Sequence, residues 1–256
     1  MADVPVLTWL GQSGFLVETG GRRLLVDPFF SDNEARTGPA PPIDELGARI
    51  DALLATHEHI DHLDLDALPL IAERSPGLTV IAPAALEEQV RGAAPDVQFR
   101  GVRPGERFEL AGGTVTVVPA VHAVHVEDGY SDGGGRFVGY VLEVDGVAIY
   151  HAGDTIATDE LVAALEPLRV DVALLPVNGR AYFREREDLA GNMDVRDAVA
   201  LAAHMGARIL VPIHWDLFEG NLERAGAAAG EAHATSAPVH VMTLAREVPW
   251  TVGAAP

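Results

Sequence analysis

Apolar residues in the first 30 positions fall into three short segments separated by glycines, a pattern typical of an antiparallel meander. Residues 31–45 are rich in Pro, Gly and Asp, which predicts a loop long enough to border a pocket. The three strands are predicted at residues 6–10, 15–18 and 23–26, with the last one ending at Asp27-Pro28.

Further along the chain, apolar runs alternate with helix-like segments, which indicates an α/β fold. Neither a linker nor a fixed-period repeat is evident, so we predict a single domain over residues 1–256. Residues 130–136 predict a glycine-rich turn, Asp145-Gly146 a hairpin, and 178–192 a polar loop. Strands are predicted at 50–56, 79–82, 114–121, 138–144, 147–150, 172–177 and 209–213. Helices are predicted at 63–73 (interrupted by Pro69), 83–91, about 155–165, 194–205 and, weakly, 225–232.

Composition narrows the class of protein. Hydrophobic residues make up 48% of the 256 positions, and no apolar run reaches the roughly 18 residues that span a bilayer. The N-terminus shows no signal-peptide pattern, so we expect a cytoplasmic protein without a membrane partner. The net charge of −20 disfavours nucleic acid as a partner. With no cysteine in the chain, a metal site would use imidazole and carboxylate ligands.

Such ligands are concentrated in the run His57-Glu58-His59-Ile60-Asp61-His62, which follows a predicted strand. His122, Asp154 and His214 also follow predicted apolar strands, where sites gather in sheet-and-helix folds. Two alternatives remain open. His125 competes with His122, which directly continues its strand, and His151 competes with Asp154.

The histidine run matches the His-x-His-x-Asp-His signature of the metallo-β-lactamase superfamily, and the chain resembles that family over nearly its whole length. The resemblance implies an αββα sandwich of two mixed β-sheets flanked by helices. It also implies that Asp154 bridges two metal ions and that Asp27 supports the ligand loop from beneath. The implied ligands are His57, His59 and His122 for the first ion, and Asp61, His62 and His214 for the second.

The resemblance further implies a metal-dependent hydrolase with one or two divalent ions per chain, Mn or Zn first and Fe or Ni next. A metal-bound hydroxide would attack the substrate, while a metal polarises the oxygen that gains charge. Catalytic roles follow for Asp61 and His62, with Asp61 orienting the water or moving a proton.

Three later segments resemble the branch that contains L-ascorbate-6-phosphate lactonase: residues 175–180, 191–193 and 212–216. This branch implies opening of a lactone or ester in a small anionic, sugar-phosphate-like molecule. Arg180 could then hold the anion, or it could pair with Glu185 or Glu187 in a surface loop. Asn178 and Asn192 are either substrate-binding residues or turn residues.

Alternative functions come from the same superfamily and from outside enzymology. A phosphodiesterase of the phospholipase-D-like kind is the runner-up, followed by a non-catalytic metal-binding protein. The expected partner is a small-molecule substrate, and since related lactonases assemble into homo-oligomers, self-association is a further option. The residues leave the native metal, its occupancy and the substrate undecided.

Overall fold

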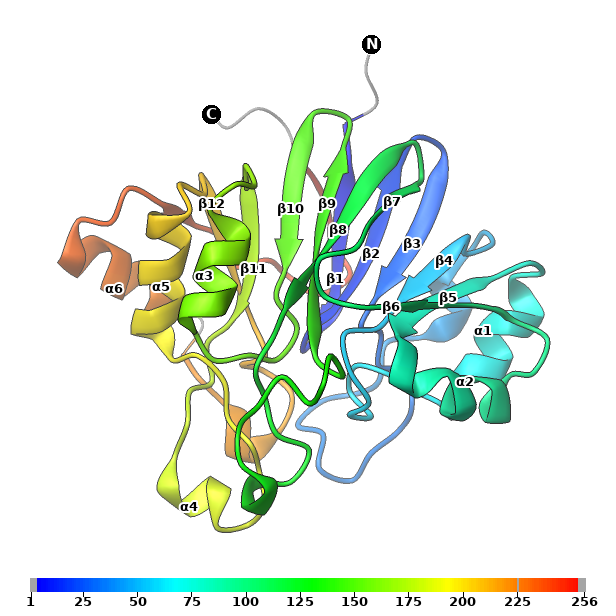
Figure 1. Cartoon of the computed structure of the whole chain (residues 1–256), viewed down its shortest axis with the longest axis horizontal. Helices are drawn as coiled ribbons and strands as arrows, with labels where there is room; N and C mark the ends of the chain where they lie inside the picture. Colours follow the sequence, from blue (N-terminus) through cyan, green and yellow to red (C-terminus); the bar gives the residue numbers. More distant parts are fainter. Residues whose placement is uncertain (1–3, 225, 253–256) are drawn as a thin grey trace.

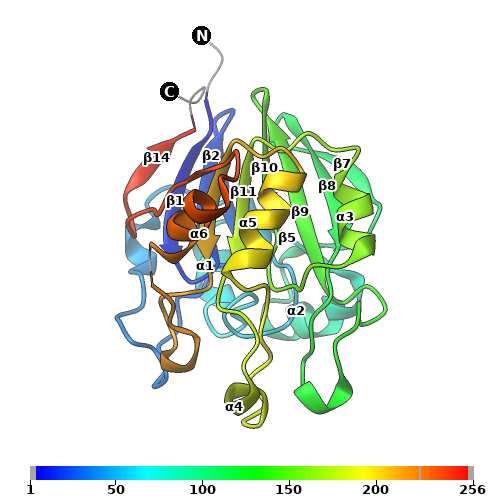
Figure 2. The same cartoon turned by 90° about the vertical axis from the view of Figure 1, so that its left-hand side faces the viewer.

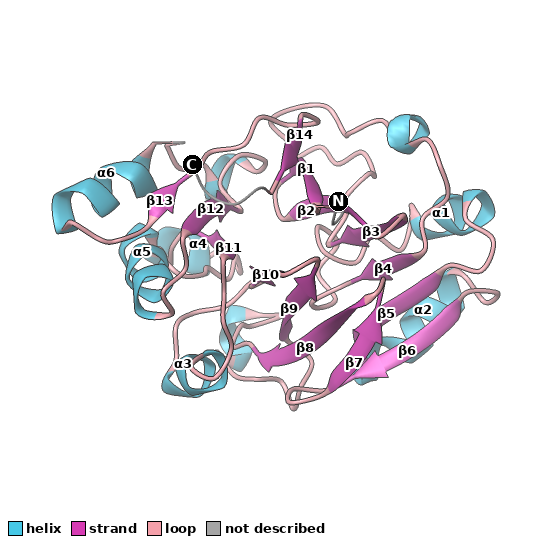
Figure 3. Cartoon of the chain, turned by 90° about the horizontal axis from the view of Figure 1, so that it is seen from above, coloured by secondary structure: helices cyan, strands magenta, loops and turns pink. Residues whose placement is uncertain are grey.

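Two seven-stranded β-sheets lie face to face, and each carries helices on its outer side (Figures 1 and 3). This arrangement is seen in a computed structural model that describes residues 4–224 and 226–252. It confirms the predicted α/β sandwich of two mixed sheets. In spatial order, the first sheet contains β14 (Pro249–Thr251), β1 (Val6–Gly11), β2 (Gly14–Thr19), β3 (Arg22–Val26), β4 (Ala52–Leu54), β5 (Thr79–Pro83) and β6 (Gln98–Val102).

Both sheets change from antiparallel to parallel pairing across their width. The glycine turns produce the antiparallel pairs β1–β2 and β2–β3, whereas β3 through β6 pair in parallel. In the second sheet β7 through β10 are antiparallel and β10 through β13 are parallel. That sheet contains, in spatial order, β13 (His240–Val241), β12 (Ile209–Ile213), β11 (Val172–Pro176), β10 (Val147–His151), β9 (Val138–Val144), β8 (Gly113–Pro119) and β7 (Arg107–Leu110).

Three apolar layers hold the sandwich together. The central layer lies between the sheets and includes Leu7, Phe15 and Tyr140, each fully buried. The outer layers bury β4, β5, β11 and β12 against helices, which explains why these parallel strands are apolar on both faces. Figure 2 shows α3, α5 and α6 in front of the second sheet. The helices are α1 (Leu68–Arg74), α2 (Glu87–Ala93), α3 (Asp159–Leu165), α4 (Tyr182–Glu185), α5 (Val195–His204) and α6 (Ala227–Thr235), with short 3-10 turns at Ile43–Leu46, Ala84–Leu86, Val126–Asp128 and Glu219–Asn221.

The predicted helix at 63–73 is shorter in the structure. It begins only at Leu68, and Pro69 lies in its first turn, where the missing N–H has no partner to lose. The residues before it form turns around the buried carboxylate of Asp64, which accepts a hydrogen bond from the Ala67 N–H across 3.0 Å. Pro69 therefore starts the helix rather than interrupting it.

Other differences lie at sheet edges and in loops. The strands β6, β7, β13 and β14, which the pattern does not predict, are the four edge strands of the two sheets. Edge strands are short and half exposed, so their apolar signal is weak. The predicted helix at 83–91 is split into a 3-10 turn and α2, and the loop at 178–192 contains α4. Ala225, the predicted start of the last helix, and residues 1–3 lie outside the described residues.

Candidate metal centre

The histidines and aspartates singled out in the sequence come together at one end of the sandwich. His57 follows β4, His122 follows β8, Asp154 follows β10 and His214 follows β12. In Figure 1 the loops after these strands run together at the lower side, near α4. Because strands of both sheets end there, residues up to 157 positions apart (57 to 214) share one buried site.

The first group of ligand-type side chains contains His57, His59, His122 and Asp154. His57 Nε2 lies 3.0 Å from His59 Nδ1, and both ring nitrogens face the same space. His122 Nε2 lies 3.5 Å from Asp154 Oδ2. One potential ligand atom from each of the four residues lies within 4.8 Å of the others, a spacing that suits a single cation.

A second group contains Asp61, His62 and His214, and Asp154 lies between it and the first. Asp154 Oδ1 is 3.2 Å from His62 Nε2, and its Oδ2 is 3.2 Å from His214 Nε2. Asp154 thus contacts histidines of both groups, as a bridging carboxylate would. The two groups together contain all seven residues that the family resemblance implies.

Asp27 supports this site from beneath without entering either group. Its carboxylate accepts hydrogen bonds from the Thr56 N–H at 2.8 Å and the Thr56 hydroxyl at 2.7 Å. The same carboxylate lies 2.7 Å from His62 Nδ1, which leaves Nε2 free to face the site. Carboxylates that orient a ligating imidazole in this way are a recurring feature of metal sites.

Gly153 allows the loop after β10 to approach Thr56. Its φ is +60°, and a Cβ atom at this position would lie 2.5 Å from the Thr56 hydroxyl oxygen. Glycine is therefore required both by the backbone conformation and by the space. The close approach places Asp154 against the histidine loop.

The protonation states divide the imidazoles into two kinds. Burial, with repulsion from neighbouring imidazoles, holds the pKa of His57 well below its ordinary value and lowers the pKa of His122 to about 4. Although burial acts in the same direction at His62 and His214, Asp154 and Asp61 raise the pKa of His62 well above its ordinary value and that of His214 to about 9. Without a metal, His62 and His214 thus hold protons where His57 and His122 present neutral ring nitrogens.

The donors fit a divalent metal. His62 Nε2, His122 Nε2 and Asp154 Oδ1 are buried and make no well-aligned hydrogen bond among the described residues, although the first and the last lie 3.2 Å apart. Buried polar atoms are normally paired, so buried nitrogen and oxygen atoms of this kind that converge on a single space are suited to bind a cation. Nitrogen and carboxylate ligands without thiolates suit Zn²⁺ or Mn²⁺.

Sequence reasoning missed Gln12, which lies in the turn between β1 and β2. The side chain is fully buried, and its Nε2 lies 2.9 Å from Asp61 Oδ2 and 3.0 Å from His214 Nε2. The backbone O of Gln12 also accepts a hydrogen bond from the His214 N–H across 3.1 Å. The only signal in the sequence was an amide residue in the short segment between Gly11 and Gly14, where a turn-forming residue is more usual.

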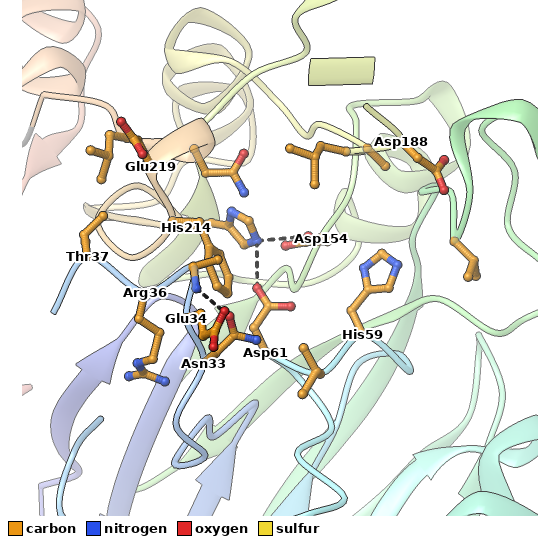
Figure 4. Close-up of a pocket in the computed structure, with 18 residues that line it drawn as sticks. Asn33, Glu34, Arg36, Thr37, His59, Asp61, Asp154, Asp188, His214 and Glu219 are labelled. Atoms are coloured by element: carbon orange, nitrogen blue, oxygen red, sulfur yellow. Dashed lines mark hydrogen bonds and ion pairs between the residues drawn. The ribbon is translucent and has the colours of Figure 1, made fainter. Parts of the chain in front are cut away.

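A cavity of about 750 Å³ opens over the two groups, a size typical of small-molecule sites. His59, Asp61, Asp154 and His214 line its floor, and Figure 4 shows them converging. The loop at 31–45 contributes part of the wall, in agreement with its predicted place at a pocket. The remaining described lining residues are Asn33, Glu34, Ala35, Arg36, Thr37, Ile60, Val124, Asp188, Leu189, Ala190, Phe218, Glu219, Asn221 and Leu222.

The residues left as alternatives by the sequence occupy different positions in the structure. His125 is exposed and lies 2.6 Å from Asp188, outside both ligand groups, whereas His122 is buried within the first. His151 Nε2 lies 2.8 Å from the Ser13 carbonyl oxygen, and its Nδ1 accepts from the Gly153 N–H, so this ring stands behind the loop of Asp154.

The three predicted substrate residues do not line the cavity. Arg180 pairs with Glu185 across 2.6 Å and lies over the ring of Tyr130, which matches the surface-pair alternative. Asn178 and Asn192 bond to each other, since the Asn192 side-chain amide donates to Asn178 Oδ1 across 3.1 Å. Both asparagines therefore brace the loop behind the cavity wall.

Comparison with known proteins places the chain among metallohydrolases. A family model described as a beta-lactamase superfamily domain matches residues 22–215. A UPF0173 metal-dependent hydrolase of Methanoregula boonei is 33% identical over 83% of each chain, and one of Methanosphaerula palustris is 32% identical over 93% of this chain and 95% of that one. Igni18, a metallo hydrolase of Ignicoccus hospitalis, shares the fold with a TM-score of 0.74 at 24% identity, covering 98% of this chain and 100% of its own. Among the described residues no helix is long and apolar enough to span a membrane.

Proposed function

This chain belongs to the metallo-β-lactamase superfamily and is a metal-dependent hydrolase, and from that premise we propose that it opens a lactone or carboxylic ester of a small molecule. The observation that carries the proposal is the pair of ligand groups joined by Asp154 at the floor of the cavity. One divalent ion would be held by each group, with Mn²⁺ or Zn²⁺ as the proposed metal. When bound, the ions supply a water that ionises near neutral pH and a Lewis acid that polarises the attacked carbonyl.

The protein's own side chains position the reaction. Asp61 lies at the cavity floor, and Gln12 donates a hydrogen bond to its Oδ2. This contact fixes the carboxylate in a position to orient water or carry a proton. His62 is locked by Asp27, which makes it a fixed ligand rather than a mobile acid. His59 and His214 complete the floor on either side of Asp61 (Figure 4).

The lining of the cavity favours an ester or lactone over a phosphodiester. A phosphodiester carries a negative charge that enzymes usually meet with arginine or lysine. The one arginine among the described lining residues is Arg36, and its guanidinium donates to the carbonyl oxygens of Ser31 at 3.2 Å and Phe29 at 3.4 Å. Phosphodiester hydrolysis therefore remains the second candidate.

The test measures bound metal by mass spectrometry and turnover on a substrate panel. We expect about one to two metals per chain in the wild type, loss of metal and activity in His59→Ala, and retained metal in His125→Ala. The panel contains uncharged lactones, aryl esters and bis(p-nitrophenyl) phosphate, each with added Mn²⁺ or Zn²⁺. Turnover of the phosphodiester alone would replace the proposal by the second candidate, and a wild type that binds no metal would refute both.

A further inference from the structure

Three carboxylates surround the mouth of the cavity above the ligand groups. Glu34, Asp188 and Glu219, here called the acidic rim, are all exposed lining residues. In Figure 4 they stand on different sides of the converging floor residues. Asp188 is paired with His125, whereas Glu34 and Glu219 make no ion pair within the described part of the chain. With Arg36 as the one arginine among the described lining residues, the side chains at the entrance therefore present net negative charge to an arriving substrate.

The two neighbouring arginines are held by acceptors of the protein itself. Arg36 turns its guanidinium away from the floor, toward backbone carbonyls of Phe29, Ser31 and Pro39 (Figure 4). Arg184 is half buried and donates to Asn221 Oδ1 across 2.6 Å and to two backbone carbonyls. Both guanidiniums are therefore directed at acceptors of the protein rather than at a substrate on the cavity floor.

Apolar side chains occupy the remaining part of the mouth. Ile60, Leu189 and Leu222 line the cavity and are 42%, 44% and 52% exposed, respectively. Val124 and Phe218 continue this surface toward the interior. Exposed aliphatic groups gathered at the entrance of a site are characteristic of surfaces that bind apolar parts of a ligand.

From these observations we infer that the substrate is an uncharged ester or lactone carrying an apolar arm, rather than a sugar phosphate. The inference rests on the proposed hydrolysis and departs from the anionic substrate that the sequence resemblance implies. The apolar arm would lie on Ile60, Leu189 and Leu222, and the acidic rim would reject anions.

The same rim suits release of the product. In the reaction a water oxygen bonds to the acyl carbon and the acyl C–O bond breaks. One proton of that water passes to the departing oxygen, and the resulting carboxylic acid loses its proton at neutral pH. A neutral substrate thereby becomes an anion inside a negatively lined mouth. Repulsion from Glu34 and Glu219 would then favour departure of the product over its retention.

The first experiment compares matched lactones on the metal-loaded protein. We expect kcat/KM to rise from γ-butyrolactone to γ-nonalactone and to fall when the alkyl end carries a carboxylate. The fall should diminish with added salt, because charges at an exposed entrance are screened. A carboxylate-bearing lactone that is turned over as well as its uncharged partner at low salt would overturn the inference.

Variants test whether the acidic rim causes the lower turnover of anionic lactones. Two like charges, each roughly 8 Å from an anion in water, weaken its binding about fivefold. We therefore expect Glu34→Gln/Glu219→Gln to raise the ratio of anionic to neutral turnover about fivefold. The matched control is Glu87→Gln/Glu88→Gln on α2, which removes the same charge from a distant exposed helix. An equal rise in the control would assign the effect to net charge and overturn the role of the rim.

Binding measurements test the inferred substrate preference independently of the proposed hydrolysis. Hexanohydroxamic acid and adipic monohydroxamic acid have the same chain length, and only the second carries a carboxylate at its far end. Calorimetry on the metal-loaded protein should show tighter binding of the first at low salt, and Leu222→Asn should weaken it about tenfold. If no lactone is turned over but this preference remains, the proposed hydrolysis fails while the inferred selectivity is supported. Equal or tighter binding of the carboxylate compound would overturn the selectivity.

Discussion

The side-chain amide of Gln12 donates a hydrogen bond to Asp61 Oδ2 across 2.9 Å and thereby joins the β1–β2 turn to the ligand loop. The same nitrogen lies 3.0 Å from His214 Nε2, so one amide contacts two members of the second ligand group. Its other terminal atom, Oε1, is buried without a partner among the described residues. Gln12 is thus the residue best placed to hold Asp61 and His214 at the spacing that a metal requires.

Replacing this amide should weaken one metal site and spare the other. We expect Gln12→Met, which keeps the volume and removes the hydrogen bond to Asp61, to lower the affinity of the second group about 10- to 100-fold. Titration calorimetry would show a weakened step beside an unchanged one. Ser13→Ala is the neighbouring control, since Ser13 touches no ligand side chain through its hydroxyl. Equal weakening of both steps would argue against a local role for Gln12.

Metal loading should release protons from His62 and His214 of the second group. The pKa of His62 lies well above its ordinary value and that of His214 is about 9, so both are protonated at pH 7 in the absence of metal. His57 and His122 have lowered pKa values and are neutral there. A metal entering the second group should therefore displace about two protons, whereas His57 and His122 have none to release.

Calorimetry in buffers of different ionisation enthalpy measures these protons directly. The slope of the observed enthalpy against buffer enthalpy gives the number released in each binding step. A proton-free second step would show that His62 and His214 are already neutral, contrary to the expected pairing with Asp61 and Asp154.

Without metal, the free energy of unfolding should decrease as the pH rises into the alkaline range. The folded-state pKa of His214 is raised from 6.5 to about 9, so its contribution is full below pH 6.5 and is lost as the pH rises through 9. His122 has the opposite pH dependence, and its contribution to stability changes at acidic pH. Its folded-state pKa is lowered to about 4, so its contribution is full above pH 6.5 and is lost as the pH falls through 4.

Urea unfolding of the metal-free protein between pH 4 and 10 should therefore show a stability maximum near neutrality. The metal-loaded protein should lack the alkaline decline, because cations replace the protons that hold Asp61 and Asp154 together. An alkaline decline of equal size in both forms would place its cause outside the ligand groups.

Gly153 offers a test of the packing beneath the site. We expect Gly153→Ala to destabilise the fold by about 3 kcal/mol, from a left-handed backbone and from the 2.5 Å approach of the new Cβ to the Thr56 hydroxyl. Gly134 has a similar φ of +68°, and a Cβ atom there would meet no other atom within 4 Å, so Gly134→Ala carries the backbone cost alone. Thermal or urea unfolding of both variants measures the difference. If the two substitutions cost the same, the contact with Thr56 is not what excludes a side chain.

Local patterns of apolar residues were sufficient to predict many of the strands and helices. Strands with strong apolar runs, such as β5 and β12, were predicted close to their observed bounds because burial on both faces demands such runs. The edge strands and the four-residue helix α4 were not predicted, because half-exposed residues leave only a weak pattern. Pro69 was read as an interruption, since the sequence does not show where Asp64 draws the chain into turns before α1.

The sequence by itself determined which residue types could hold a metal. His57, His59, Asp61 and His62 lie in one short loop, and strand ends predict where His122, Asp154 and His214 should fall. Short-range spacing and the alignment of strand ends are properties of the chain that can be read without coordinates.

Only the tertiary structure decided what surrounds those ligands. It placed His122 inside the first group and His125 outside it, turned Arg180 toward Glu185, and brought Gln12 against Asp61 and His214. It also gathered Glu34, Asp188 and Glu219, from three distant loops, at one entrance. The physical reason is that side-chain direction and long-range proximity depend on how two sheets pack, and no local pattern of residues encodes that packing.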